Sequence, residues 1–290
     1  MKALKIDLDD FVRSGEGANG SSYDSISDPS VMIKLYNVDY PLQPIIDELE
    51  VARKVYDLGV KSPEPGELVT DGERTGIRFR RIIGKKSFSR MIADNPERTE
   101  EYARDFAFLC RELHAIECPE GMFPSAKEQY SSLADKVNGL DEGQRNFLKE
   151  MLAGLPDSTT ALHGDMHMGN VIRTGNEDYF IDLGYFAQGY PLIDLGMTYS
   201  ICNASSKDFV EHDFHVSQDL LRERFWPVFV ENYFHNPVLG DSPCLKDIDE
   251  NDIDGSLLKF YCIKSLLVGY NVGTMLPEAL EAIEKVRRNA

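Results

Sequence analysis

The sequence has no closely spaced pair of cysteines. Its five cysteines are scattered between Cys110 and Cys262 without a CxxC motif. This spacing gives no sign of a metal site or of a disulfide framework, so we expect free thiols in a reducing cytoplasm. The chain also lacks any run that reaches the ~18 apolar residues of a membrane span. Its opening, MKALKIDLDDFV, has no apolar core of the secretory-signal type. The sequence therefore predicts a cytoplasmic protein with no membrane partner.

Basic residues are few: 31 lysines and arginines stand against 49 aspartates and glutamates, for a net charge of −18. Such an acidic chain is a poor electrostatic match for nucleic acid, whereas it suits a cationic ligand. Repeats and low-complexity segments are absent, and the hydrophobic content of 42% is ordinary for a globular protein. The 290 residues suffice for one large domain or for two lobes, and they leave the oligomeric state open.

The first part of the chain, residues 1–83, has the pattern of a small β-rich lobe. SVMIKLY, from Ser30, is a short β-rich run, and residues 44–60 have apolar residues at nearly helical spacing with Gly59 at the end. Two further strands, joined at Asp71-Gly72, follow this helix.

The rest of the chain, residues 84–290, is mainly helical in pattern. Residues 96–117 and 127–153 each predict one helix, and the chain is again helical from about residue 206, with a loop near 236–253. Short strands are expected around residues 170–172 and 179–181. The predicted fold is therefore α+β, with a small β-rich lobe and a larger helical lobe.

A GxGxxG motif occupies the first lobe, with glycines at Gly15, Gly17 and Gly20. Glycine lets backbone N–H groups approach phosphate oxygens closely. A dinucleotide-binding motif would need a helix directly after the glycines, whereas turn and strand residues follow here. A glycine loop between two strands is typical of the phosphate cover of a protein-kinase-like fold, although a plain flexible turn would have the same sequence.

Lys34 is a single charge among the apolar residues of VMIKLY, on the strand expected after the glycine loop. From there an ammonium group can reach the α- and β-phosphates of a nucleotide, and an acidic partner is needed to hold it. Glu48 and Glu50 both lie on the following helix. They face different sides because they are two residues apart, and we choose Glu48 over Glu50 as this partner.

The stretch LHGDMHMGNVIRTGNEDYFIDLG, from Leu162, contains the candidate catalytic and metal-binding residues. A carboxylate can accept the proton of a substrate hydroxyl, and Asp165 is our candidate for this base. Mg²⁺ prefers a few oxygen ligands from protein and keeps the rest for phosphate and water. The amide of Asn170 and the carboxylate of Asp182 fit that preference, so we expect them to be the metal ligands.

Two histidines flank the candidate base. His163 and His167 are four residues apart, which would suit zinc only on a helix, and Gly164 and Gly169 argue against a helix here. We therefore expect His163 to orient the loop through hydrogen bonds and His167 to support it without contacting the reacting atoms.

HGDMHMGN, followed by IDLG and GYPLIDLGM, resembles the aminoglycoside phosphotransferase and choline kinase family, a branch of the protein-kinase-like fold. The family pattern is HGDxHxxN followed by IDxxxxxxGxPxxDL. The matching residues are His163, Gly164, Asp165, His167 and Asn170, and then Asp182, Gly189, Pro191, Asp194 and Leu195. The resemblance covers roughly residues 10–200.

The resemblance implies further roles. It favours Glu48 over Glu50 as the partner of the lysine, and it implies that Asp194 braces the catalytic loop. FRRIIG resembles the hinge of the family, which implies that Arg80 and Ile82 contact the nucleotide. Ser22 and the hinge arginines depart from the usual pattern, so GTP remains open beside ATP.

The implied function is an ATP- and Mg²⁺-dependent transfer of phosphate to a hydroxyl of a small molecule that is aminoglycoside-, amino-alcohol- or sugar-like. A protein serine/threonine kinase is disfavoured by the short segment between IDLG and GYP. A nucleotide-binding pseudokinase with a signalling role is disfavoured because every expected catalytic position is filled. A cationic acceptor would need carboxylates in the helical lobe, and the candidates are Asp208, Glu211, Asp213 and Asp219.

Overall fold

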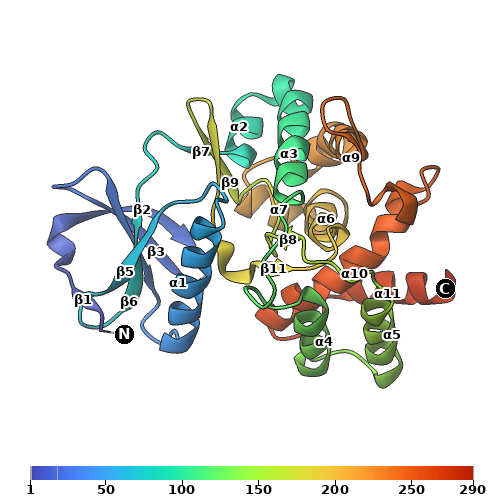
Figure 1. The fold of residues 1–290 in the computed structure, drawn as a ribbon, viewed down its shortest axis with the longest axis horizontal. Helices are drawn as coiled ribbons and strands as arrows, with labels where there is room; N and C mark the ends of the chain where they lie inside the picture. The colour runs from blue at the N-terminus through green and yellow to red at the C-terminus, as the bar shows by residue number, and fades with distance from the viewer. Residues whose placement is uncertain (1, 18, 290) are drawn as a thin grey trace. The chain divides into compact units, whose positions relative to one another are not determined.

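The computed structural model describes residues 2–17 and 19–289, so Ala18 of the glycine motif lies outside the described residues. The chain forms two compact units, each of which is drawn in Figure 1. The first unit contains Met1–Lys86 and Val171–Gly184, and the second contains Ser87–Asn170 and Tyr185–Ala290. Residues 171–184 therefore cluster with the N-terminal part of the chain, although they lie far from it in sequence.

The first unit is built on a six-stranded sheet with the order β1-β5-β6-β4-β3-β2. Neighbouring strands are antiparallel, except that β1 pairs with β5 in parallel. The strands are β1 (Leu4–Lys5), β2 (Phe11–Gly17), β3 (Gly20–Ser25), β4 (Val31–Tyr36), β5 (Pro65–Thr70) and β6 (Thr75–Arg80). The expected strands of residues 30–36 and on either side of Asp71-Gly72 are confirmed as β4, β5 and β6.

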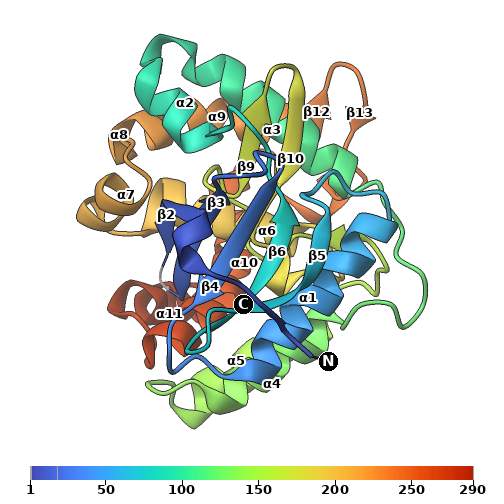
Figure 2. The ribbon, with the colours of Figure 1, turned by 90° about the vertical axis from the view of Figure 1, so that its left-hand side faces the viewer.

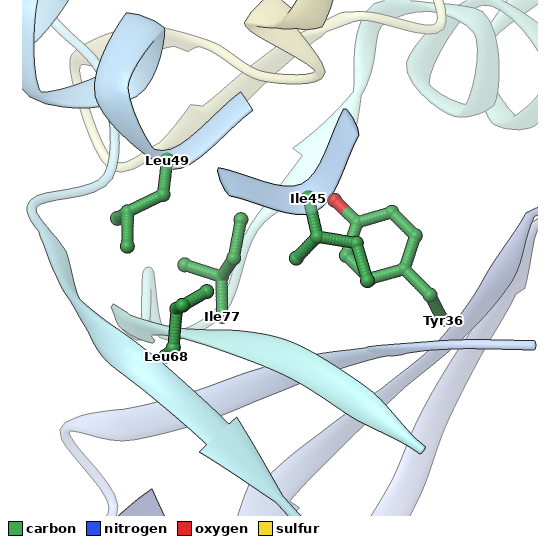
Figure 3. Close-up of a cluster of buried hydrophobic side chains, with 5 residues drawn as sticks. All are labelled: Tyr36, Ile45, Leu49, Leu68 and Ile77. Atoms are coloured by element: carbon green, nitrogen blue, oxygen red, sulfur yellow. The ribbon is translucent and has the colours of Figure 1, made fainter. Parts of the chain in front are cut away.

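Helix α1 (Leu42–Asp57) covers one face of this sheet, as Figure 2 shows. Its buried positions are Ile45, Leu49, Ala52 and Val55, which repeat at the spacing of one helical face. Figure 3 shows Leu49 above Ile77 and Leu68 and Ile45 beside the ring of Tyr36. The chain leaves the helix through Gly59, whose φ of +87° favours glycine. The predicted helix and its end are thus confirmed.

The two faces of β4 are buried against different partners. Ile33 and Leu35 pack with Val69 on the face away from the cluster of Figure 3, whereas Tyr36 belongs to that cluster. Because side chains alternate along a strand, Lys34 lies on the same face as Tyr36, toward α1. The sheet therefore presents the lysine to the helix that carries the candidate glutamates.

The second unit is mainly helical. Its helices are α2 (Phe88–Asp94), α3 (Thr99–Leu113), α4 (Ala126–Lys136), α5 (Glu142–Ala153), α6 (Leu192–Tyr199), α7 (Lys207–Asp213), α8 (Gln218–Leu220), α9 (Trp226–Phe234), α10 (Ile253–Val272) and α11 (Pro277–Asn289). No helix in the described part of the chain combines the length and apolarity that a bilayer crossing needs.

Short strands complete the two units. The hairpin of β9 (Val171–Thr174) and β10 (Glu177–Phe180) belongs to the first unit, and both strands lie within about two residues of their predicted places. In the second unit β8 (Ala161–Leu162) pairs with β11 (Ala187–Gln188), and β12 (His235–Asn236) pairs with β13 (Gly240–Asp241). The loop predicted near residues 236–253 thus contains a small hairpin. Strand β7 (Lys86–Ser87) lies at the boundary of the units.

The prediction of a single helix over residues 127–153 is wrong. Helix α4 ends at Lys136, and α5 begins again at Glu142. Gly139 between them has a φ of +92°, which a helix does not accommodate. Asp141 then starts a new helix because its side chain and that of Gln144 form a capping box. The helix predicted over 96–117 begins with a short turn at Pro96–Arg98 and continues as α3.

Candidate active site

In the first unit, the ammonium group of Lys34 lies between two carboxylates. Its Nζ is 2.9 Å from Oε1 of Glu48 and 3.1 Å from Oδ1 of Asp182. Glu50 is exposed on α1 and is not the residue that faces the lysine. Burial acts to lower the pKa of Lys34, but the charges of Asp182 and Glu48 outweigh it and raise this pKa well above its usual value. The lysine is therefore a fixed positive charge.

Glu48 reaches Lys34 because its helical neighbours are anchored. Ile45 and Leu49 point into the cluster of Figure 3, which fixes the rotation of α1 about its axis. Glu48 precedes Leu49 and so lies at the edge of the buried face, half-buried beside β4. The ion pair therefore depends on the same apolar packing that holds the helix to the sheet.

Asp182 follows strand β10 in an unusual backbone conformation. Its φ is +57°, in the left-handed region that Asp and Asn tolerate better than other residues with side chains. Such local strain persists where the surrounding structure determines it, and it is common at ligand sites. Here the conformation accompanies the contact of the Asp182 carboxylate with Lys34.

A cavity of the first unit opens beside these three charged groups. Its lining consists of Ser22, Met32, Lys34, Glu48, Ala52, Pro63, Phe79, Lys85, Ile181, Asp182 and Leu183. The mixture of apolar side chains with a few converging charges is typical of a small-molecule site. Sequence reasoning missed the apolar members, because only the strand pairing brings Met32 next to Phe79.

The predicted hinge residues, Arg80 and Ile82, are not among the described residues that line the cavity. Arg80 ends β6 and points to Glu64 at 3.8 Å, and both side chains are largely exposed. Among the described residues, those that line the cavity include neither Arg80 nor Ile82. Their contact with a nucleotide stays a prediction.

The glycine motif forms the end of the β2–β3 hairpin, where Gly17 pairs with Gly20. A Cβ atom on Gly20 would lie only 2.2 Å from the carbonyl oxygen of Leu35, so packing of β3 on β4 requires glycine there. Gly15 and Gly17 are exposed on β2, and a Cβ atom on either would meet only ordinary contacts. The structure thus explains Gly20 by strand packing, whereas phosphate binding by all three stays a prediction.

In the second unit, Asp165 and Asn170 face each other across one short loop. The Nδ2 of Asn170 donates to the carbonyl oxygen of Asp165 at 2.9 Å and to its Oδ2 at 3.1 Å. Burial acts to raise the pKa of Asp165, but the neighbouring His167 and the charge of Lys264 outweigh it and hold this pKa below its usual value. The candidate base is therefore ionised at neutral pH.

Both histidines of this loop accept hydrogen bonds from the backbone. Nδ1 of His163 lies 3.3 Å from the nitrogen of Asp165, and Nδ1 of His167 lies 3.1 Å from the nitrogen of Gly169. The Nε2 of His167 is 3.6 Å from Oδ2 of Asp165. These contacts fit the predicted orienting roles, since each ring holds the backbone two residues further along.

Asp194, in the first turn of α6, binds the start of the loop. Its carboxylate accepts the backbone N–H of His163 at 2.7 Å and that of Gly164 at 2.9 Å. It is fully buried, and Nε2 of His114 lies 3.3 Å away. Burial acts to raise the pKa of Asp194, but its contact with His114 and the charge of Lys264 outweigh it and lower this pKa. A permanent negative charge therefore fixes the backbone just before Asp165.

Three residues of this network were missed from the sequence: His114, Tyr130 and Lys264. His114 lies at the end of α3, and its other nitrogen is 2.8 Å from the hydroxyl of Tyr233. A signal was present for Lys264, because it is the only charged residue between Lys259 and Glu278. Lys34 is isolated among apolar residues in the same way.

Two of the four acidic residues proposed to bind a cationic acceptor already form ion pairs with a lysine. Lys207, the first residue of α7, lies 2.7 Å from Asp219 of α8 and 3.7 Å from Glu211, which is four residues further along α7. Asp208 occupies the first turn of α7, where the helix dipole favours a carboxylate without any ligand. An acceptor amine at this place would have to displace a lysine.

Asn170 and Asp182 each carry an oxygen atom of the type that Mg²⁺ binds, and their part in a metal site stays a prediction. Because Nδ2 of Asn170 faces Asp165, the amide oxygen Oδ1 is the atom that it can offer a cation. Asp182 offers a carboxylate that is half exposed. Amide and carboxylate oxygens are the ligands that Mg²⁺ prefers, with phosphate and water completing the shell. Asn170 belongs to the second unit and Asp182 to the first.

Comparisons with known proteins identify the family of this chain. The model of the phosphotransferase enzyme family matches residues 15–226, which is well over half of the chain. A comparison with curated proteins found no match.

Solved structures share the fold. Aminoglycoside phosphotransferase APH(4)-Ia is similar with a TM-score of 0.60 at 12% identity, over 96% of this chain and 92% of the other. Amicoumacin kinase hAmiN, solved with AMP-PNP, Ca²⁺ and Ami, has a TM-score of 0.54 at 12% identity, over 99% and 89%. A choline/ethanolamine kinase family protein from Mesorhizobium loti has a TM-score of 0.51 at 16% identity, over 96% and 86%. The chain belongs to the phosphotransferase enzyme family, and it is a phosphotransferase with the α+β, protein-kinase-like fold that its sequence predicts.

Proposed function

We propose that this protein transfers the γ-phosphate of ATP to a hydroxyl group of a small molecule, with Mg²⁺ as cofactor. The observation that carries the proposal is the placement of Lys34 between Glu48 and Asp182 at the mouth of a mostly apolar cavity. A fixed ammonium group beside an apolar pocket suits a ligand that has a flat ring at one end and phosphates at the other. Residues 1–83 would carry the nucleotide, and residues 84–290 would carry catalysis and the acceptor.

In this reaction Asp165 accepts the proton of the acceptor hydroxyl. Its carboxylate is held by Asn170 and stays ionised, so it is ready to orient and deprotonate an alcohol. Lys34 binds the phosphates, and Glu48 keeps the lysine in place. Asn170 and Asp182 would hold the magnesium ion, which neutralises charge on the transferred phosphoryl group.

The identity of the acceptor is proposed only as a class. Similar structures are named as kinases of aminoglycosides, of amicoumacin and of choline or ethanolamine, which all carry hydroxyl groups. A net charge of −18 favours a cationic acceptor of this kind. We therefore propose a hydroxylated amine, such as an amino alcohol or an aminoglycoside, ahead of a neutral sugar.

The test is transfer of radiolabelled phosphate from ATP, and in parallel from GTP, to a panel of aminoglycosides, amino alcohols and neutral sugars. Casein and histone serve as generic protein acceptors. Labelling of a small molecule alone supports the proposal, and labelling of protein alone would establish a protein kinase instead. Nucleotide binding without transfer to any acceptor or to water would indicate a pseudokinase.

For an amine acceptor, we expect KM to increase with salt. Attraction between opposite charges is screened over a Debye length of about 8 Å at physiological ionic strength. Measuring KM in rising concentrations of KCl checks this, with ATP saturating and a neutral sugar of similar size as control. A preferred acceptor that is neutral, with KM independent of salt, would contradict the amine proposal and leave the phosphotransferase assignment intact.

The ion pair in the first unit gives a further prediction. Lys34→Ala is expected to lower kcat/KM for ATP by about 10- to 100-fold, the value of one or two hydrogen bonds to a charged group. Glu48→Ala is expected to have a similar effect because it releases the lysine, and the melting temperature of both variants should stay near that of the wild type.

Glu50→Ala is the matched control, since Glu50 lies on the same helix but is exposed. Its kinetics should equal those of the wild type. A loss of activity in Glu50→Ala that matches the loss in Glu48→Ala would show that the Lys34–Glu48 pair is not what holds the nucleotide.

A further inference from the structure

A lysine is buried in the centre of the second unit. Lys264 lies on α10 with no solvent exposure, and its ammonium group donates hydrogen bonds to the Tyr130 hydroxyl and to the Gly164 carbonyl oxygen. Burial lowers the pKa of Lys264, while the charges of Asp194 and Asp165 act in the opposite direction. Burying an ammonium group costs free energy that a methionine of similar length would not require. This cost calls for an explanation other than packing.

The carbonyl that Lys264 binds belongs to the residue directly before the candidate base. The N–H of Gly164 is bound by Asp194 at 2.9 Å, so the backbone of this glycine is held on its other side as well. Gly164 has a φ of +81°, and a Cβ atom there would lie 1.8 Å from the carbonyl oxygen of Tyr185. One anion and one cation thus hold the backbone that leads into Asp165. Position 164 cannot accommodate any residue larger than glycine.

The approach of α10 to this loop depends on a second glycine. A Cβ atom on Gly196 of α6 would lie 2.3 Å from the carbonyl oxygen of Phe260 and 2.8 Å from Cγ of Lys264. Gly196 therefore lets α10 pack closely enough for the stem of Lys264 to run past α6 to the loop. Asp194, two residues earlier on the same helix, binds the other side of Gly164.

We propose that Lys264 is a positioning residue for phosphoryl transfer: by holding the carbonyl of Gly164 it sets the direction in which the carboxylate of Asp165 meets the acceptor hydroxyl. This inference rests on the function proposed above. Lys264 touches neither nucleotide nor acceptor in this role and acts through the backbone of the loop. Its removal should therefore lower kcat and leave nucleotide affinity unchanged, because the residues proposed to bind nucleotide lie in the other unit.

The test is the pair Lys264→Met and Lys259→Met. Lys264→Met replaces the lysine with an unbranched apolar side chain that is one atom shorter, and it removes both hydrogen bonds. Lys259→Met is the matched control, since Lys259 is a half-buried lysine of the same helix whose ammonium group lies over the ring of Phe260. The assay is phosphate release from MgATP with water as acceptor, so that no knowledge of the natural acceptor is needed, and Asp165→Asn is run in parallel.

We expect Lys264→Met to lower kcat by about 10- to 100-fold, the cost of a small misplacement of a catalytic group. The KM for ATP should stay the same, and Lys259→Met should retain the kcat of the wild type. A residue that only stabilises the core would instead change the melting temperature and leave kcat unaltered in the folded protein. If Lys264→Met does not fold, Lys264→Gln, which keeps a neutral donor, is measured in the same way.

Unchanged kcat in Lys264→Met overturns the inference, and so does an equal loss of kcat in Lys259→Met, which would point to the packing of α10. These results are distinguishable from failure of the proposed function. If Asp165→Asn releases phosphate as fast as the wild type, or if the wild type neither releases nor transfers phosphate, the proposed function itself is wrong whatever Lys264→Met does.

Discussion

Replacing Asp165 with asparagine is expected to lower kcat by about 10²- to 10⁴-fold, the usual contribution of a general acid–base group. The substitution keeps the shape of the side chain and removes its ability to accept a proton. Affinity for ATP should change little, because the residues proposed to bind nucleotide lie in the first unit, around Lys34. Steady-state kinetics with the best acceptor of the panel, together with calorimetry of ATP binding, measure both quantities.

Asp135→Asn provides the control for this experiment. Asp135 is also a carboxylate of the second unit, but it is exposed and pairs with Lys149 at 2.6 Å on the surface of α4 and α5. It should leave kcat unchanged. Turnover of Asp165→Asn at the wild-type rate would remove Asp165 from the catalytic role and leave Asn170 and His167 without a group to orient.

The second large effect is expected from Asp182→Asn. Loss of one carboxylate ligand should weaken Mg²⁺-dependent ATP binding and lower kcat by about 10³-fold, since a bound metal supplies several kcal/mol of transition-state stabilisation. Asparagine is chosen because it tolerates the φ of +57° at this position, so the loss reports on charge and not on backbone strain. Alanine would combine the two effects.

Calorimetry with and without EDTA measures this dependence on metal. In the wild type, EDTA should weaken ATP binding strongly, and in Asp182→Asn it should have little further effect. Equal affinity of the wild type for ATP with and without Mg²⁺ would show that Asp182 is not a metal ligand. The pairing of Asp182 with Lys34 would then be its main contribution.

Much of the local structure could be predicted because it depends on short-range patterns. Apolar residues at helical spacing identified α1 and its buried face, and the β-rich composition of VMIKLY identified β4. The break between α4 and α5 was missed although its signals, Gly139 and the capping pair of Asp141 and Gln144, are also local. The prediction of one continuous helix gave more weight to the apolar periodicity on either side of the break than to the capping residues.

Residues of the candidate site could be predicted where a charged side chain stands in a sequence context in which such a side chain is rare. An isolated lysine in an apolar strand, and carboxylates beside glycines in a loop, are enough to indicate Lys34, Asp165 and Asp182. By contrast, Glu48 and Glu50 could not be separated by chemistry alone. The rotation of α1, set by Ile45 and Leu49 in the core, decided between them.

By itself, the sequence determined the family, the α+β character and the residue types that carry the chemistry, because each is encoded in composition, periodicity or a contiguous motif. Only the tertiary structure decided which distant residues meet. Residues 171–184 join the sheet unit, His114 reaches Asp194 across 80 positions, and Lys264 reaches Gly164 across 100. Contacts at such separations depend on how helices and strands pack, and packing is a property of the whole core that no local pattern records.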